Sequence, residues 1–171
     1  MTTTAGPDAE GSGAHPRFAE ALRALGLGDL VGQVRRFPDA TRTAAEAAAA
    51  IGCELSQICK SLIFAADRVP VLVLMDGASL VDLELVRKEL GADKVTRAKV
   101  DVVRETTGYA IGGVPPFGHR TRTRVLADRS LLDHDVVWAA AGTPYTVFPM
   151  APEDLVAHAD GTLVDVRERT A

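Results

Sequence analysis

Lys60 could take part in chemistry because it is a single cation in an otherwise apolar run. Residues 58–64 read Ile-Cys-Lys-Ser-Leu-Ile-Phe. An isolated buried charge is unfavourable, so the ammonium must reach water or meet a partner. Lys60 is either a lysine that extends from a strand end into solvent or a positive charge at the mouth of a cleft. In the second case it would bind a carbonyl, a phosphate or a developing oxyanion.

A second stretch, residues 107–118, contains four glycines and two prolines in the order Thr-Gly-Tyr-Ala-Ile-Gly-Gly-Val-Pro-Pro-Phe-Gly. Glycine permits positive φ and lets a ligand approach the main chain, whereas Pro115 and Pro116 fix φ and lack amide donors. We expect a stiff loop with exposed amides around Gly112 and Gly113 that lines one hollow together with Lys60. The same composition is also typical of an ordinary connection between strands.

Three arginines alternate just after this loop, at Arg120, Arg122 and Arg124. In an extended strand all three would project from one face, because successive side chains point to opposite sides. They could form a phosphate-binding ridge. The alternative is a solvated strand face or a protected sheet edge.

Other signals of enzyme chemistry are missing from the sequence. It contains no GxSxG elbow, P-loop, HExxH motif or dinucleotide-binding glycine pattern. Cys53 and Cys59 lie six residues apart, which fits neither a CxxC pair nor a zinc site, and we expect buried thiols and no metal or cofactor. Among the four histidines only His119 follows the glycine-rich stretch closely.

The 171 residues are enough for one core, which we expect to span residues 16–171 after a disordered tail over residues 1–15. The net charge of −4 argues against non-specific coating of nucleic acid. No apolar run reaches the roughly 18 residues of a membrane span, and the start lacks the features of a signal peptide. We therefore expect a cytoplasmic protein that has no contact with a membrane.

Patterning predicts helices over residues 16–25, 43–52, 83–90, 99–106 and 152–158, and strands over residues 31–37, 58–66, 69–75, 125–127, 136–140, 145–148 and 162–166. Thr43 and Glu46 form a capping-box pattern, while Asp82 and Gly91 fit the start and the stop of the third helix. Interleaved short strands and helices indicate an α+β domain. Its sheet is expected to be mixed, mainly antiparallel and barrel-like, with flanking helices.

Four features taken together resemble the YbaK/prolyl-tRNA synthetase editing-domain family. They are residues 57–64, Thr107-Gly108-Tyr109, residues 112–118 and Asp128, and the resemblance runs from about Phe18 to Val166. The order and separation of these features are distinctive, although each is common by itself. The resemblance implies a mixed α/β barrel-like fold and a trans-acting deacylase that hydrolyses mischarged tRNA, related to the domain inserted in bacterial prolyl-tRNA synthetase.

The resemblance also implies roles for individual residues. Lys60 falls on the key lysine of the family, and Gly112 to Pro116 fall on its G-x-x-x-P loop. An aminoacyl ester is already activated, so hydrolysis needs a positioned carbonyl and a stabilised oxyanion more than a strong base. The substrate-binding positions would be Ser61, Gly108, Tyr109, Gly112, Gly113, Pro116, Ala140, Ala141 and Gly142.

The segment Ala140-Ala141-Gly142 departs from the family pattern, because some members have a Ser-Gly-Gly type segment there and other subgroups a histidine. It offers no side-chain donor, and the Ser61 hydroxyl could replace the missing one. The implied substrate is tRNA(Pro) carrying Cys, Ala or another small amino acid, and prolyl-tRNA synthetase is an implied partner. Two alternatives remain open: a non-catalytic tRNA-binding or synthetase-associated module of the same fold, and a small-molecule esterase.

Overall fold

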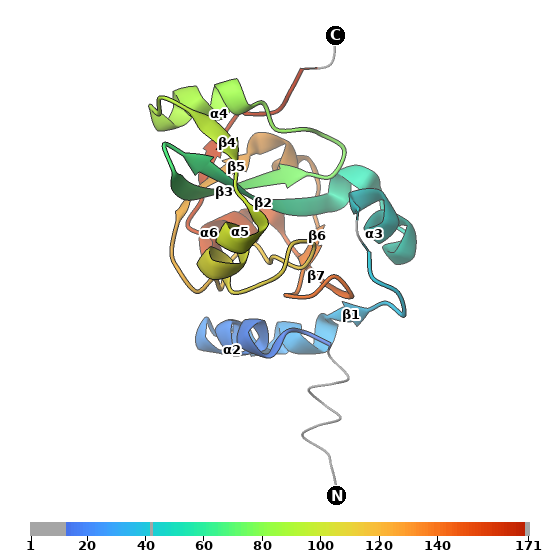
Figure 1. Ribbon diagram of the computed structural model, residues 1–171. Helices are drawn as coiled ribbons and strands as arrows, with labels where there is room; N and C mark the ends of the chain where they lie inside the picture. Colours follow the sequence, from blue (N-terminus) through green and yellow to red (C-terminus); the bar gives the residue numbers. More distant parts are fainter. Residues whose placement is uncertain (1–12, 42, 170–171) are drawn as a thin grey trace, which may run out of the picture.

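The structure, a computed structural model, describes residues 13–41 and 43–169, and a sheet of eight strands runs through them with helices on both sides (Figure 1). The elements are α2 (Pro16–Ala24), η1 (Gly28–Gln33), β1 (Arg35–Arg36), α3 (Ala44–Ile51), η2 (Leu55–Gln57), β2 (Ile58–Ala66), β3 (Val69–Asp76), α4 (Leu83–Leu90), β4 (Val95–Arg97), α5 (Val100–Thr107), β5 (Arg124–Asp128), η3 (Arg129–Asp133), β6 (Val137–Ala140), β7 (Thr146–Met150), α6 (Pro152–His158) and β8 (Thr162–Val164).

The predicted N-terminal tail spans residues 1–15, and residues 1–12 of it lie outside the described residues. Residues 13–15 belong to the folded part: Ala14 is buried, and the His15 side chain accepts a hydrogen bond from the Arg17 amide at the start of α2. The His15 amide also donates to Ala141 O at 3.0 Å. The beginning of the chain as described is therefore attached to the turn after β6.

Local sequence signals determine where the helices begin and end. Thr43 and Glu46 form the predicted capping box at α3, and the Asp82 side chain accepts from two amides at the start of α4. Gly52 and Gly91 end these helices in the left-handed conformation, which glycine adopts without steric cost. These parts of the prediction are confirmed.

The sheet is mixed, with the strand order β1-β7-β6-β2-β3-β5-β8 and with β4 paired to β2 outside this path. β2 and β3 form the predicted hairpin, and β2 is antiparallel to β4 but parallel to β6. The sheet is not closed into a barrel, because in the described part of the chain its order ends at β1 and β8. The α+β class and the mixed sheet are confirmed.

One predicted element needs correction, and one strand was missed. Residues 31–37 do not form one strand; they are divided between the 3-10 helix η1 and the two-residue strand β1, which pairs with β7. The short strand β4 was not predicted, because a three-residue strand carries too little alternation to be recognised.

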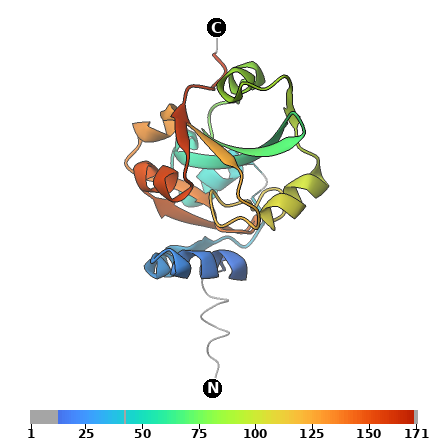
Figure 2. The ribbon, with the colours of Figure 1, turned by 90° about the vertical axis from the view of Figure 1, so that its left-hand side faces the viewer.

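The two faces of the sheet pack against different helices (Figures 1 and 2). One face contributes Cys59 and Ile63 to a core that includes Phe18 of α2 and Leu155 of α6. On the opposite face Phe64 packs in a second core around Val86 of α4. Alternation along β2 thus directs its side chains to opposite faces, while Ile58 at its start packs against α3 in a third, smaller cluster. None of the helices in residues 13–41 and 43–169 has the length and hydrophobicity of a membrane span.

Candidate active site

Strand β2 changes partners along one of its edges. Ile58 and Cys59 pair with β6, and residues 64–66 pair with β4. Residues 60–63 between them are in register with β3 alone among the described strands. The middle of β2 therefore has one edge that no neighbouring strand covers.

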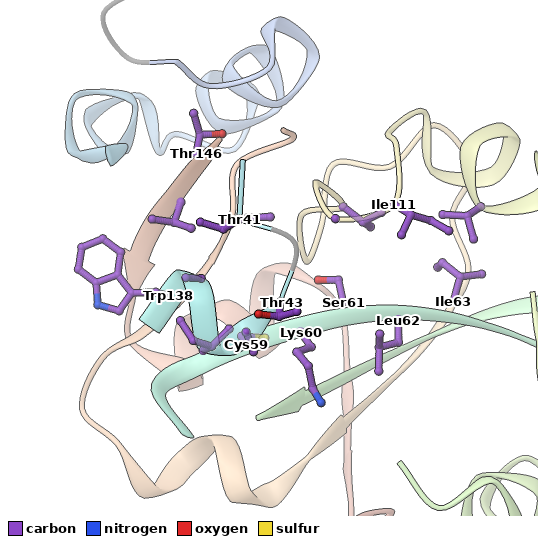
Figure 3. Close-up of a pocket in the computed structure, with 18 of the residues that line it drawn as sticks. Thr41, Thr43, Cys59, Lys60, Ser61, Leu62, Ile63, Ile111, Trp138 and Thr146 are labelled. Carbon is purple, nitrogen blue, oxygen red and sulfur yellow. The ribbon is translucent and has the colours of Figure 1, made fainter. Parts of the chain in front are cut away.

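A cavity of about 340 Å³ lies against this uncovered edge (Figure 3). Its walls come from β2, the start of α3, the glycine loop, β6 and β7. They include Thr41, Thr43, Ala44, Ala47, residues 58–64, Arg97, Ala98, Val103, Ile111, Gly112, Val114, Trp138, Ala140, Thr146 and Val147. A volume of this size and a mainly apolar wall suit a small ligand.

No described residue of this wall is an aspartate, glutamate or histidine. Cys59 belongs to the wall, but burial raises the pKa of its thiol to about 12, so it remains protonated and weakly nucleophilic near neutral pH. The cavity therefore offers neither a strong protein base nor a thiolate. It is suited to a reaction that depends on positioning and electrostatics.

The Lys60 side chain extends from the opposite side of β2 to Ser61 and Ile63, which lie nearer Ile111 (Figure 3). Its Nζ atom donates a hydrogen bond of 2.6 Å to Ser79 O. Burial lowers the pKa of Lys60, and the negative charge of Asp76 partly opposes this shift. Lys60 and Gly112 both border this cavity, as expected of one hollow, but the Lys60 ammonium lies on the other face of β2 from the loop.

Lys60 also lines a polar groove of about 1240 Å³ on its own face of the sheet. Arg97 borders both this groove and the apolar cavity, as Lys60 does. Arg97 is opposite Phe64 in the β2–β4 register, which places its side chain on the same face as that of Lys60. The two compartments meet at the uncovered edge of β2.

A network of buried carboxylates supports the turn that holds Lys60. Asp76 Oδ1 accepts from the Ala78 amide at 2.9 Å, and Asp76 Oδ2 accepts from Ser130 Oγ at 2.5 Å. Asp128 accepts from the Ser130 amide and from the Val166 amide, which anchors this segment to the end of the chain. These bonds fix the turn that presents Ser79 O to the ammonium.

The glycine loop is held by its own side chains. The Tyr109 hydroxyl donates to Gly118 O at 2.9 Å, and burial raises the pKa of this tyrosine to about 12. His119 Nε2 donates to Pro115 O at 2.6 Å. Gly112 has a φ of 92° and borders the cavity, while the Gly113 amide already donates to Ala110 O. Of the two amides that we expected to be exposed, only that of Gly112 has no acceptor among the described residues.

The structure brings four of the predicted site residues to the cavity wall, namely Lys60, Ser61, Gly112 and Ala140. The six others do not line it: Gly108, Tyr109, Gly113, Pro116, Ala141 and Gly142. Gly108 ends α5, Ala141 is fully buried, and a Cβ at Gly142 would collide with His15.

The three arginines do not form the predicted single ridge. Only Arg124 lies in a strand, because the amides of residues 120 and 121 donate to carbonyls at the end of α5. Arg120 borders a hollow beside α5, whereas Arg122 and Arg124 border another next to the β2–β3 turn. Arg122 also pairs with Asp160 at 3.3 Å.

Sequence reasoning missed Trp138 and Arg97 in the wall. Trp138 lies in β6 within the predicted strand over residues 136–140, and the Arg35 guanidinium is 5.6 Å from its ring centre. The parallel pairing of Ile58 with Trp138 brings it to the cavity, and such long-range register is not readable from one strand. A tryptophan in a short strand was the available signal.

Comparison with known families shows to which family the chain belongs. Residues 38–157 match the aminoacyl-tRNA editing domain. The chain belongs to this family. The predicted family is thereby confirmed, and the match includes the cavity, the glycine loop and most of the sheet.

Individual proteins that are similar to the chain agree with this family assignment. YwhH of Bacillus subtilis is 34% identical over 124 residues, which cover 71% of this chain and 78% of YwhH. A proline–tRNA ligase of Streptococcus sanguinis is 33% identical over 92 residues, 54% of this chain but only 15% of the ligase. A solved candidate trans-editing enzyme for prolyl tRNA synthetase is 38% identical with a TM-score of 0.84, covering 98% of this chain and all of that one.

Proposed function

We propose that this editing-domain protein is a trans-acting aminoacyl-tRNA deacylase that hydrolyses the ester of mischarged tRNA. The observation that carries the proposal is the apolar cavity at the uncovered edge of β2, bounded by the glycine loop and without a carboxylate or histidine in its described wall. Such a wall suits an activated ester, which needs orientation more than a protein base. The similar solved structure, a candidate trans-editing enzyme for prolyl tRNA synthetase, supports this proposal.

In the proposed reaction, the acyl group enters the cavity and its carbonyl oxygen faces the Gly112 amide, which stabilises the developing oxyanion. Water attacks the carbonyl carbon, the ester bond to the ribose oxygen breaks, and that oxygen leaves with a proton. Lys60 acts as the catalytic cation from the groove face, where its ammonium binds the phosphate of the terminal nucleotide. This position follows from the direction of Nζ, which points away from the loop.

The proposed substrate is tRNA(Pro) carrying a small amino acid such as Cys or Ala, and the proposed partner is prolyl-tRNA synthetase, as the ligase relative suggests. Such a reaction would take place in the cytoplasm, where charged tRNA is used. Arg120, Arg122 and Arg124 are candidates for contacts with tRNA phosphates outside the cavity. Because they border two separate hollows, their contributions should be separable.

The test is a deacylation assay with tRNAs charged with different amino acids. We expect Lys60→Ala to lower kcat/KM by at least tenfold and Lys60→Arg to restore part of it, because the guanidinium keeps the charge. Lys88→Ala is the matched control, since Lys88 is an exposed lysine of α4 that borders neither compartment. Hydrolysis that is equally fast in the parent and in Lys60→Ala would contradict the assigned role.

A non-catalytic tRNA-binding module is the second candidate, because Ala140-Ala141-Gly142 brings no side-chain donor to the wall. Binding of charged tRNA without release of the amino acid would favour it. An esterase for small molecules predicts instead that aminoacyl esters lacking the tRNA body are hydrolysed as fast as charged tRNA. It also predicts no effect of charge reversal at the three arginines.

A further inference from the structure

The Ser61 hydroxyl is a buried polar atom without a partner. Among the described residues, only Ser61 Oγ and Thr123 Oγ1 are buried side-chain oxygen or nitrogen atoms that make no hydrogen bond. Thr123 does not border the cavity, whereas Ser61 does. Buried polar atoms in folded proteins are nearly always paired, so an unpaired one at a cavity wall is a position where a ligand or water can form a hydrogen bond.

The other hydroxyls of the wall are already engaged. Thr41 Oγ1 donates to Pro144 O at 3.0 Å, and Thr43 Oγ1 accepts from the Glu46 amide at 3.1 Å. Thr146 Oγ1 shares a hydrogen bond of 2.8 Å with another threonine. Ser61 therefore has the one hydroxyl of the described wall that makes no hydrogen bond at all.

The position of Ser61 is rigid and its surroundings are apolar. It is in register with Leu74 of β3, which is fully buried, and Ile63 follows it on the same face of β2. The cavity wall has no described carboxylate that could neutralise an ammonium. An aminoacyl ester bound here would be expected to keep its α-amino group near the open side, which leaves the space next to Ser61 to the side chain of the amino acid.

We propose that the Ser61 hydroxyl recognises a hydroxyl or thiol on the side chain of the esterified amino acid, an inference that rests on the proposed deacylase function. A serine hydroxyl can both donate and accept, so it can pair with either group. Thiols form weaker hydrogen bonds than hydroxyls. The preferred order is serine, then cysteine, then alanine esters, although these three side chains differ little in size.

The test compares seryl-, cysteinyl- and alanyl-tRNA prepared on one tRNA body. We expect the parent to hydrolyse the seryl ester about tenfold faster than the alanyl ester in kcat/KM, which is the effect of one neutral hydrogen bond. Ser61→Ala should remove this preference by slowing the seryl ester and leaving the alanyl ester unchanged. Ser56→Ala is the matched control, because the Ser56 hydroxyl bonds to His134 and does not border the cavity.

The outcomes separate this inference from the proposed function. An equal loss on all three esters in Ser61→Ala would show that Ser61 acts on the common part of the substrate, and an unchanged seryl rate would show that water is its partner; either result overturns the inference. If the parent hydrolyses none of the esters, the proposed function fails. Recognition is then measured by calorimetry with non-hydrolysable seryl and alanyl amides of 3′-aminoadenosine. Equal affinities would overturn the inference, and a seryl preference that is lost in Ser61→Ala would support it.

Discussion

Replacing Gly113 by alanine tests whether the glycine loop positions the substrate. A Cβ at Gly113 would lie 2.7 Å from Thr143 Cα and 2.9 Å from Thr143 N. The shorter distance is about 0.7 Å below the 3.4 Å at which ordinary van der Waals contact begins. Because the opposing atoms are backbone, no flexible side chain can move aside. The loop itself must shift, and the neighbouring Gly112 shifts with it.

The expected cost follows from this distance. Overpacking of this kind destabilises a protein by about 1–3 kcal/mol, and each kcal/mol lowers the melting temperature of a chain of this size by about 2–4 °C. Misplacing a catalytic group by about 1 Å can cost roughly 100-fold in rate, so we expect a loss of roughly 10- to 100-fold in deacylation. The assays are thermal unfolding and kcat on mischarged tRNA.

Gly32→Ala is the matched control for Gly113→Ala. A Cβ at Gly32 would meet no described atom within 4 Å, and Gly32 does not have a positive φ. We expect Gly32→Ala to keep the parental activity and melting temperature within error or to raise the latter slightly, since alanine restricts the unfolded chain. If Gly113→Ala behaves like Gly32→Ala in both assays, the loop does not hold the carbonyl and the reasoning fails.

Three further predictions concern buried groups. Ser130→Ala should lower the free energy of unfolding by about 1–3 kcal/mol in urea denaturation, because buried Asp76 loses a donor; Ser61→Ala, which breaks no bond, should not lower it. Burial lowers the pKa of His119, so the unfolded chain binds the proton more readily. Neutral His119 therefore stabilises the fold fully above about pH 6.5, and this stabilisation is lost as the pH falls through the folded pKa. His119→Asn should make the free energy of unfolding fall less between pH 7 and pH 5 than it does in the parent. An equal fall in both proteins would contradict this. Cys59, with a pKa of about 12, should resist iodoacetamide at pH 8 until the protein unfolds, whereas the partly exposed Cys53 should react first. Mass spectrometry of the labelled peptides measures the order of the two reactions.

The helices and the central hairpin could be predicted because their signals are local. Asp82 and Gly91 mark the ends of α4, and Asp67-Arg68 forms the turn between β2 and β3 with positive φ at both residues. Each of these signals involves residues close together in the chain. The tertiary contacts of these segments agree with the local signals and do not override them.

The site was predictable in part. Alternation along β2 establishes that Lys60 and Ser61 point to opposite faces, but it does not tell which face has the cavity. The arginine ridge failed for a similar reason. The pattern of Arg120, Arg122 and Arg124 is that of a strand, yet two backbone hydrogen bonds attach residues 120 and 121 to the end of α5.

The uncovered edge of β2 is produced by its neighbours and not by its own sequence. Strand β6 stops at Ala140, because the chain then turns through Gly142, whose φ of 100° and contact with His15 leave room for no side chain. From the other end, β4 pairs with β2 only as far as Arg97, before the chain enters α5. The Ala98 amide still donates to Ile63 O at 3.3 Å, so the main chain of β2 is open to a ligand at residues 60–62. Gly142 does not border the cavity, so we expect it to act by shaping the site and not by binding the ligand directly. A substitution there should remove activity by closing or distorting the cavity, and this distinguishes Gly142 from Lys60 and Ser61, whose replacement leaves the cavity in place.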